Sequence, residues 1–420
     1  MGVYMITVKV KWFLFLLCLL PILGCSIDFK DPEKVISSYY QAAFSDKDFK
    51  RSYKYLSSES KKHTSFDEYQ KVISDKFKPR KIMSINTLQE DKDKLAYRRV
   101  KVIYEITDKE KTFKDIAYYT LINEDGKWKI LLLWTLFKSA DDQFKKGFYR
   151  EAIKQLEEIL LINPYYGDVY NGIAQCYIKL GEKEKALENI KTAIALEPEY
   201  WQYYFIMAEY YDEVEQLTDL AIENIKKAIS SEYSSDSDKS NNYKKLSKYY
   251  QKQKDYENAL NSVDKAIELD DLNASAYWRK AEILLSSSGQ TINFNLRDNS
   301  SKTISNLNLM EKTNKLLLKA IEVNEKNEEK LAPDILPDLY YQLATAEAYL
   351  EDYINAKKHV LKALELRPDD NEAKRFYQAI EIAKWNWFLA PEETRKEFEL
   401  RLSDRAAGKK TEIISKVGAD

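Results

Sequence analysis

Paired stripes of apolar residues at helical spacing recur along most of this chain. In residues 167–200, one stripe precedes Gly181 and one follows it, and they consist of Tyr170, Ile173, Ala174 and Tyr177 and of Ala186, Ile190 and Ala193. Spacings of three and four residues place each stripe on one face of a helix. Pro198 ends the second helix, because its ring excludes a continuing helical backbone. The pattern predicts two helices that pack against each other across a tight turn.

The same frame occurs about six times between residues 135 and 370. Its recurring positions include Ala152, Leu156, Ile159; Tyr204, Ala208, Ala221, Ala228; Tyr243, Ser247, Ala259, Ala266; Tyr277, Ala281, Leu317, Ala320; and Tyr340, Ala344, Ala356, Ala363. With Gly167 as position 1, the small residues fall at positions 8, 20 and 27. This unit resembles the 34-residue tetratricopeptide repeat. The resemblance implies a mainly α-helical solenoid, and the number of matches in frame disfavours the alternative, an irregular helical domain.

Residues 25–135 do not follow this repeat and predict a small α+β domain. Asp31-Pro32-Glu33 is a helix start, and Ser65 with Glu68 forms a capping box. Together with apolar spacing these signals predict three helices. After Pro79 the apolar period changes to two, which predicts strands over 81–89, 95–106, 113–122 and 127–134, with a hairpin turn at 123–126. The order of elements resembles the nuclear transport factor 2-like fold, and a generic α+β domain is the alternative.

The resemblance to that fold implies a cone whose mouth can hold a ligand, and enzymes of the family use an Asp/His pair inside it. The single histidine of the domain, His63, is expected in a surface loop before the third helix. The strand faces offer no evident acid–base pair, so we expect no enzyme. Arg98 and Arg99 either bind an anion or lie on a solvated strand face.

The first 25 residues have the features of a targeting segment. Lys9 and Lys11 precede an apolar run over 12–23, which ends at Gly24-Cys25. This resembles a bacterial lipobox, and the resemblance implies a signal peptide over 1–24, cleavage before Cys25, and diacylglycerol and acyl chains such as palmitate on Cys25. The protein is then expected in the bacterial cell envelope, and Ser26 in place of Asp favours the outer membrane where the host has one. An uncleaved anchor or an ordinary signal peptide is the alternative.

The remaining boundaries follow from composition and periodicity. The last predicted strand runs into the repeat array, 136–370, without a Gly/Ser/Pro linker, which predicts a rigid junction. A Ser/Asp-rich loop is expected at 230–240 and a long insertion at 286–311, which delays the second helix of the fifth repeat. Residues 371–405 are expected to form capping helices, and 406–420 a flexible tail.

Charge and composition indicate no catalytic, metal or cofactor chemistry. The 66 basic and 68 acidic residues are balanced, so nucleic acid is not the expected partner. The only histidines are His63 and His359, and no metal-ligand cluster or glycine-rich phosphate loop is present in the sequence. Cys176 is expected to be a small buried residue. No cofactor is therefore expected.

The resemblance to tetratricopeptide repeats implies that positions 2, 5, 9, 12 and 13 of each first helix line a concave groove. The partner-binding residues expected there are Asn171, Gln175, Phe205, Lys244, Lys248, Trp278, Arg279, Glu282, Tyr341 and Gln342. The aromatic members either bind a partner or pack between helices, including the helix expected after residue 371. For the lysines, pairing of Lys248 with Glu209 and of Lys252 with Glu213 is favoured over a basic site for an acidic ligand.

Two functions follow from these features. The first is an envelope lipoprotein that binds a protein or peptide in the groove, as a scaffold or assembly factor. The alternative is a small-ligand sensor or enzyme that uses the cone of the N-terminal domain.

Overall fold

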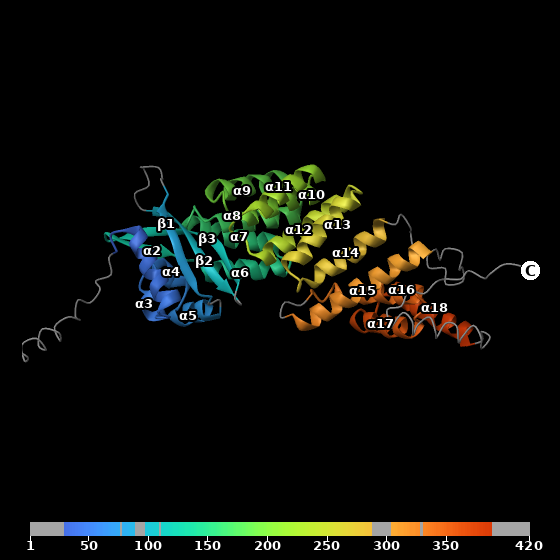
Figure 1. Ribbon diagram of the computed structural model, residues 1–420. Coiled ribbons are helices and arrows are strands. Elements are labelled where there is room, and N and C mark those ends of the chain that lie inside the picture. Colours follow the sequence, from blue (N-terminus) through green and yellow to red (C-terminus); the bar gives the residue numbers. More distant parts are fainter. Residues whose placement is uncertain are drawn as a thin grey trace, which may run out of the picture. The chain divides into compact units, whose positions relative to one another are not determined.

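The computed structural model describes residues 29–75, 78–88, 97–108, 111–287, 304–327 and 331–388. The expected signal peptide, Cys25, the second capping helix and the C-terminal tail lie outside these residues. Contacts divide the chain into two compact units, Met1–Ile206 with Ser231–Ser234, and Met207–Ser230 with Ser235–Asp420. Figure 1 shows the elements of both units. The first unit joins the N-terminal domain to the first repeats, so the division of contacts does not fall at the predicted boundary near residue 135.

The N-terminal domain begins with short helices whose starts match the predicted caps. They are α2 (Pro32–Tyr40), the π-helical turn η1 (Gln41–Ser45), α3 (Phe49–Tyr53), α4 (Ser58–His63) and α5 (Phe66–Asp75). Asp31 accepts from the backbone amides of Glu33 and Lys34, and Ser65 and Glu68 form the reciprocal bonds of a capping box. Helix α4 was not expected. His63 is its last residue and half-buried, so its placement in a surface loop was wrong.

Four antiparallel strands follow in the order β1-β2-β3-β4: β1 (Arg80–Thr87), β2 (Tyr97–Asp108), β3 (Lys111–Glu124) and β4 (Lys127–Leu131). The hairpin at 123–126 is confirmed. Asp125 and Gly126 both have positive φ, and the Gly126 amide donates to the Asn123 side chain over 2.9 Å. Strand β4 ends at Leu131 rather than at Trp134, because Trp134 begins helix α6 (Trp134–Lys145).

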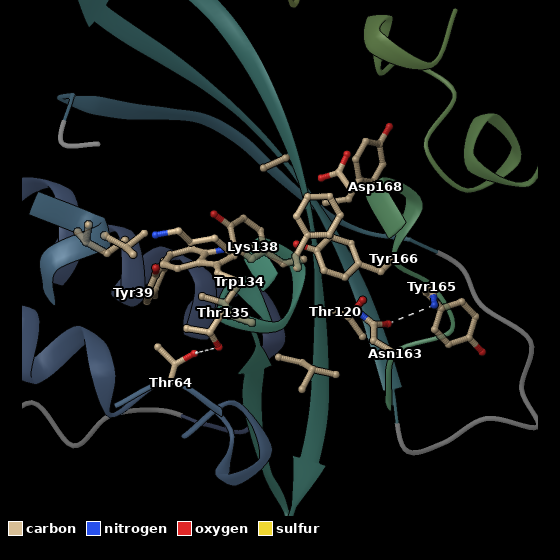
Figure 2. A pocket seen from close by; sticks show the side chains of 18 of the residues that line it. Tyr39, Thr64, Thr120, Trp134, Thr135, Lys138, Asn163, Tyr165, Tyr166 and Asp168 are labelled. Carbon is tan, nitrogen blue, oxygen red and sulfur yellow. Dashed lines mark hydrogen bonds between the residues drawn. The ribbon is translucent and has the colours of Figure 1, made fainter. Parts of the chain in front are cut away.

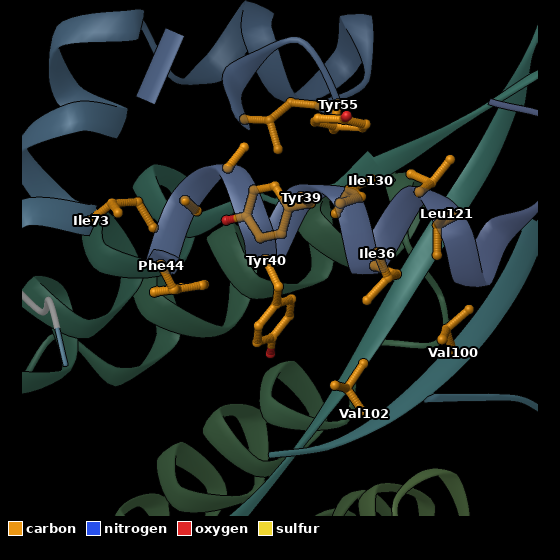
Figure 3. Packing of buried hydrophobic residues seen from close by; sticks show 14 of the residues in the cluster. Ile36, Tyr39, Tyr40, Phe44, Tyr55, Ile73, Val100, Val102, Leu121 and Ile130 are labelled. Atoms are coloured by element: carbon orange, nitrogen blue, oxygen red, sulfur yellow. The ribbon is translucent and has the colours of Figure 1, made fainter. Parts of the chain in front are cut away.

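One face of this sheet packs on the N-terminal helices. Val100 and Val102 of β2 lie in the same buried cluster as Ile36 and Tyr40 of α2 (Figure 3). Alternating residues of a strand point to opposite faces, so the run Val100, Val102, Tyr104, Ile106 is buried as one row. Each such apolar side chain stabilises the fold by about 1.5–3 kcal/mol on full burial.

The opposite face of β2 meets the first repeats inside the same unit. Arg99 is only 8% exposed, and its Nη2 donates to the carbonyl of Leu196 over 2.7 Å. A cation there also complements the C-terminal end of α9 (Lys183–Leu196), where carbonyl groups lack helical partners. Both expectations for Arg99, an anion site or a solvated face, were therefore wrong. Arg98 lies with its guanidinium carbon 5.2 Å from the centroid of the Trp128 ring.

The junction between sheet and repeats is as short as predicted. Only two residues separate β4 from α6, and Leu131 and Leu133 share one buried cluster with Ile153 of α7 (Tyr149–Ile162) and Ile173 of α8 (Gly167–Leu180). The sheet and the first repeat helices therefore share a hydrophobic core.

The helical array confirms the mainly α-helical, tetratricopeptide-repeat fold expected from the sequence. Its further helices are α10 (Trp201–Glu213), α11 (Thr218–Ser230), α12 (Asp236–Lys252), α13 (Tyr256–Leu269), α14 (Ala274–Ser287), α15 (Ile304–Lys326), α16 (Leu336–Tyr349), α17 (Tyr353–Leu366) and α18 (Asn371–Phe388). The small residues of the frame have no exposed surface at Ala174, Ala186 and Ala193, and Cys176 is buried beside them. Gly181 ends α8 in the left-handed conformation, with φ of 72°. In the part of the chain that the structure describes, every helix is too short or too polar to span a bilayer.

Two predicted loops are shorter than expected. Helix α12 already begins at Asp236, because Ser235 and Asp238 form a capping box. Helix α15 begins at Ile304, so the last part of the expected insertion 286–311 is helical, and Leu317 and Ala320 of α15 are buried as the delayed second helix requires. Helix α18 packs Phe376 and Ile380 on the last repeat, as expected of a capping helix.

Candidate functional site

The first unit contains a cavity of about 700 Å³ where the sheet meets the first repeats. Its walls come from α2, α5, β1, β3, α6, α8 and the turns before and after the α8–α9 pair, and aromatic side chains dominate them. Figure 2 shows Tyr39, Trp134, Tyr166 and Asp168 around it. The volume falls within the range of sites that bind small molecules.

One wall of this pocket carries two buried carboxyl groups that share a tyrosine. The Tyr203 hydroxyl lies 2.5 Å from Oε2 of Glu197 and 3.1 Å from Oδ1 of Asp168. Gly167 donates its amide to Glu197 over 3.3 Å, and a Cβ on Gly167 would lie 2.6 Å from the Tyr203 oxygen. A larger residue at position 167 would therefore displace the side chains of Tyr203 and Glu197.

Burial raises the pKa of both carboxyls and so favours their protonated forms. It raises the pKa of Glu197 to about 8, the neighbouring Asp168 carboxylate contributes to the same shift, and the Tyr203 hydrogen bond and Arg99 oppose it. Burial raises the pKa of Asp168 as well. Oε1 of Glu197 lies 3.9 Å from Nη2 of Arg99, whose positive charge acts against the upward shift in the pKa of Glu197.

The pocket also contains a half-buried cation, Arg80. The guanidinium carbon of Arg80 lies 4.6 Å from the ring centroid of Phe44 and 4.8 Å from that of Tyr104. Its Nε atom is buried without a hydrogen-bond partner. Lys138, which is exposed, also lines the pocket.

Neither histidine forms a catalytic arrangement with the pocket. His63 Nε2 lies 3.2 Å from Glu59 on the same helix, and His359 Nδ1 lies 2.7 Å from Oε2 of the buried Glu347 in the last repeat. Within the ranges that the structure describes, no three His, Cys, Asp or Glu side chains gather in a metal-binding group.

In the second unit, the acidic residues of α10 pair with lysines of α12, but not in the predicted register. Lys245, rather than Lys248, lies 2.7 Å from Oε1 of Glu209, and Lys252 lies 2.6 Å from Oδ1 of Asp212 rather than from Glu213. The two predicted pairs were wrong because equal repeat positions do not lie directly opposite each other. Asp212 is 1% exposed in its side chain, so this pair is not a surface ion pair.

This pairing leaves two lysines of α12 without a carboxylate. Lys244 donates to the side chains of Asn241 and Ser275, and among the described residues no carboxylate lies within ion-pair distance of Lys244 or Lys248. Burial lowers the pKa of Lys244 to about 8, and the charges of Lys245 and Arg279 contribute to the same shift. Burial and the charges of Lys245 and Lys252 also lower the pKa of Lys248. Two neighbouring cations are thus kept in partly buried positions without counter-ions.

Two aromatic members of the predicted groove, Trp278 and Tyr341, are engaged within the second unit. The Trp278 indole donates to Oε1 of Gln342 over 2.8 Å, and its ring packs on the cluster formed by α14, α15 and α16. The Tyr341 hydroxyl donates to Glu372 over 3.1 Å, and its ring meets Phe376 edge-on at 5.4 Å. Of the two roles expected for these rings, packing between helices is the one present.

The other predicted groove residues have mixed surroundings. Arg279 pairs with Glu282 on the same helix at 2.8 Å. Asn171, Gln175 and Phe205 belong to the first unit, where Asn171 is 9% exposed and the other two are half-buried. The sequence patterns did not indicate Lys245, Arg80 or the Asp168–Glu197 pair. An acidic residue in an otherwise apolar stretch was the available signal for Asp168.

Comparison with known proteins supports the repeat assignment. Residues 143–206, 242–271 and 337–370 match the tetratricopeptide repeat family. The chain is 34% identical over 80 residues to the Hsp70-Hsp90 organizing protein of Triticum aestivum, a match that covers 17% of this chain and 14% of the relative. It is 40% identical over 62 residues to anaphase-promoting complex subunit 3 of Dictyostelium discoideum, which covers 15% of this chain and 6% of that protein.

The solved structure of pilF from Pseudomonas aeruginosa is also similar, with 15% identity, a TM-score of 0.43, and coverage of 58% of this chain and 95% of pilF. Of the two curated relatives described above, by contrast, the chain spans only 14% and 6% of the length. Three features agree: the matched segments, the buried small residues of the frame and the paired helices. This chain carries a tetratricopeptide-repeat solenoid that follows a small α+β domain in the sequence.

Proposed function

We propose that the protein is a cell-envelope scaffold that binds an acidic segment of a partner protein on the first helices of its central repeats. The observation that carries this proposal is the pair Lys244 and Lys248, which are partly buried, close to Arg279 and without a carboxylate of their own. A carboxylate from a partner would supply the missing counter-ion. Tetratricopeptide repeats commonly present such helix faces as extended binding surfaces.

Charge reversal tests this proposal against a matched control. Lys248→Glu should abolish capture of the partner from solubilised membranes, whereas Lys265→Glu, on the exposed side of α13, should leave capture intact. Lys265 is 56% exposed and pairs with Glu268 of its own helix. Both variants replace a lysine by a glutamate, so they change the net charge equally. Equal capture by both variants would contradict the proposal.

The lipid anchor is part of the same proposal. A basic-apolar run that ends at Gly24-Cys25 supports cleavage and acylation at Cys25, and several acyl chains would hold the protein stably on a membrane. Replacement Cys25→Ser should abolish labelling by palmitate in the native host and release the protein from the membrane fraction. Absence of label on the unaltered protein would contradict this part.

A second candidate function is the binding of a small molecule in the cavity where the N-terminal sheet meets the first repeats. The cavity of about 700 Å³ favours it, and the order of helices and strands supports our proposal that the N-terminal domain has the nuclear transport factor 2-like fold. Because the acid pair of the pocket is tied to Tyr203 and Arg99, binding rather than catalysis is the role that we propose for the cavity.

A further inference from the structure

The pocket of the first unit offers a ligand an aromatic wall. The ring of Trp134 stacks on that of Tyr69 with an interplanar angle of 4°, and the rings of Phe137 and Tyr166 lie 6.2 Å apart. Trp134, Phe137 and Tyr166 all line the cavity, and Figure 2 shows Trp134 and Tyr166 beside it. Such a surface suits a flat apolar body rather than a strongly hydrated molecule.

Arg80 is the polar group of the pocket that the protein leaves unsatisfied. No hydrogen bond or ion pair joins its guanidinium to another described residue, although the group lies between two rings and its Nε is buried. The nearby Asp115 carboxylate instead accepts from the Tyr104 hydroxyl over 2.8 Å and from the Ile116 amide over 2.8 Å. A buried guanidinium without an acceptor is costly, and its fork of donors matches an oxyanion.

The acidic groups of the pocket do not oppose an anion. Asp168 and Glu197 share the Tyr203 hydroxyl, Glu197 faces Arg99, and burial favours the protonated form of both carboxyls. The exposed Lys138 adds a second cation at the lining, and the third lining acid, Asp141, pairs with Lys145 at 2.5 Å. Arg80 is thus the charged group of the lining for which a ligand carboxylate would be the first acceptor.

We propose that this pocket binds an organic anion, with its carboxylate on the guanidinium of Arg80 and its apolar, aromatic body against Trp134, Phe137 and Tyr166. The inference rests on the second candidate function and is independent of the lysines of α12. It assigns to the cavity a ligand class that neither the repeats nor the fold of the small domain specifies.

Calorimetric titration of the purified full chain with three probes of one shape tests the inference. The probes are 4-(1-naphthyl)butyrate, its primary amide and the corresponding amine. The acid should bind at least roughly tenfold more tightly than the amide, because only the acid offers a charged acceptor to Arg80. The variant Arg80→Gln should remove this preference, whereas Arg98→Gln, on the same sheet but outside the cavity lining, should keep it.

The possible results are distinct. Equal binding of acid and amide would overturn the anion preference and leave the cavity as a ligand site. Tightest binding of the amine would overturn it in favour of the Asp168–Glu197 pair. Absence of binding by all three probes would overturn both this inference and the second candidate function. The comparison of acid with amide uses the unaltered protein, so it does not depend on the folding of a variant.

Discussion

Replacement of Glu197 by glutamine should change how the stability of the first unit depends on pH. Glu197 lies where α9 ends, between Tyr203, Gly167 and Arg99, and its side chain is 7% exposed. Burial raises its pKa from 4.5 to about 8 in the folded chain. The folded protein therefore holds this proton more tightly than the unfolded chain does.

The sign and size follow from that difference. Stability from Glu197 is fully present below pH 4.5, falls as the pH rises, and is lost above about pH 8. Between these limits the slope approaches about 1.4 kcal/mol per pH unit, so the contribution falls by roughly 2–4 kcal/mol from about pH 5 to 8. The amide side chain in the variant Glu197→Gln carries no titrating proton, so the variant should lack this part of the decline.

Urea unfolding at intervals between about pH 5 and 8, followed by the tyrosine and tryptophan signal, measures the effect. The free energy of unfolding of the unaltered protein should fall more steeply with pH than that of Glu197→Gln. Glu184→Gln, an exposed position on the same helix, should behave like the unaltered protein. Parallel curves for all three proteins would refute the protonated state that we assign to Glu197.

Three other predictions concern the repeats. Ala186→Leu should lower the free energy of unfolding by about 1–3 kcal/mol, because Ala186 has no exposed surface; an unchanged thermal melt would mean that it faces solvent. Trp278→Ala should lower the free energy of unfolding by about 2–3 kcal/mol, below the roughly 3–5 kcal/mol typical of a fully buried tryptophan, because Trp278 is only half-buried. Trp278→Phe should lose only the hydrogen bond to Gln342, about 0.5–1.5 kcal/mol of the free energy of unfolding. Lys252→Met should cost about 1–3 kcal/mol, because the buried Asp212 then lacks its cation, and a double-mutant cycle with Asp212→Asn should show coupling between them.

The repeats were predictable because their frame is local. Ala174, Ala186 and Ala193 recur at fixed spacing, and each is buried where two helices touch. Helix α4 was missed because its sequence, SESKKH, has no apolar stripe. It is held instead by polar contacts that sequence spacing does not reveal: the buried Ser60 donates to the carbonyl of Ile130 over 3.2 Å.

The lysine pairs and the pocket depend on distances between elements. Lys245 reaches Glu209 over a separation of 36 residues and Lys252 reaches Asp212 over 40, so the spacing of equal repeat positions does not encode either contact. The pocket brings Arg80 of β1 together with Asp168 and Glu197 of the repeats, which are far apart in sequence. No local pattern in either segment indicates that they line one cavity.

In the function that we propose, the lysine-bearing face of α12 contacts the partner protein. A photo-crosslinking amino acid placed at position 248, and in a separate variant at position 265, tests this contact in the native host. We expect a discrete crosslinked partner from position 248 and none from position 265. Crosslinks of equal yield from both positions, or from neither, would contradict it.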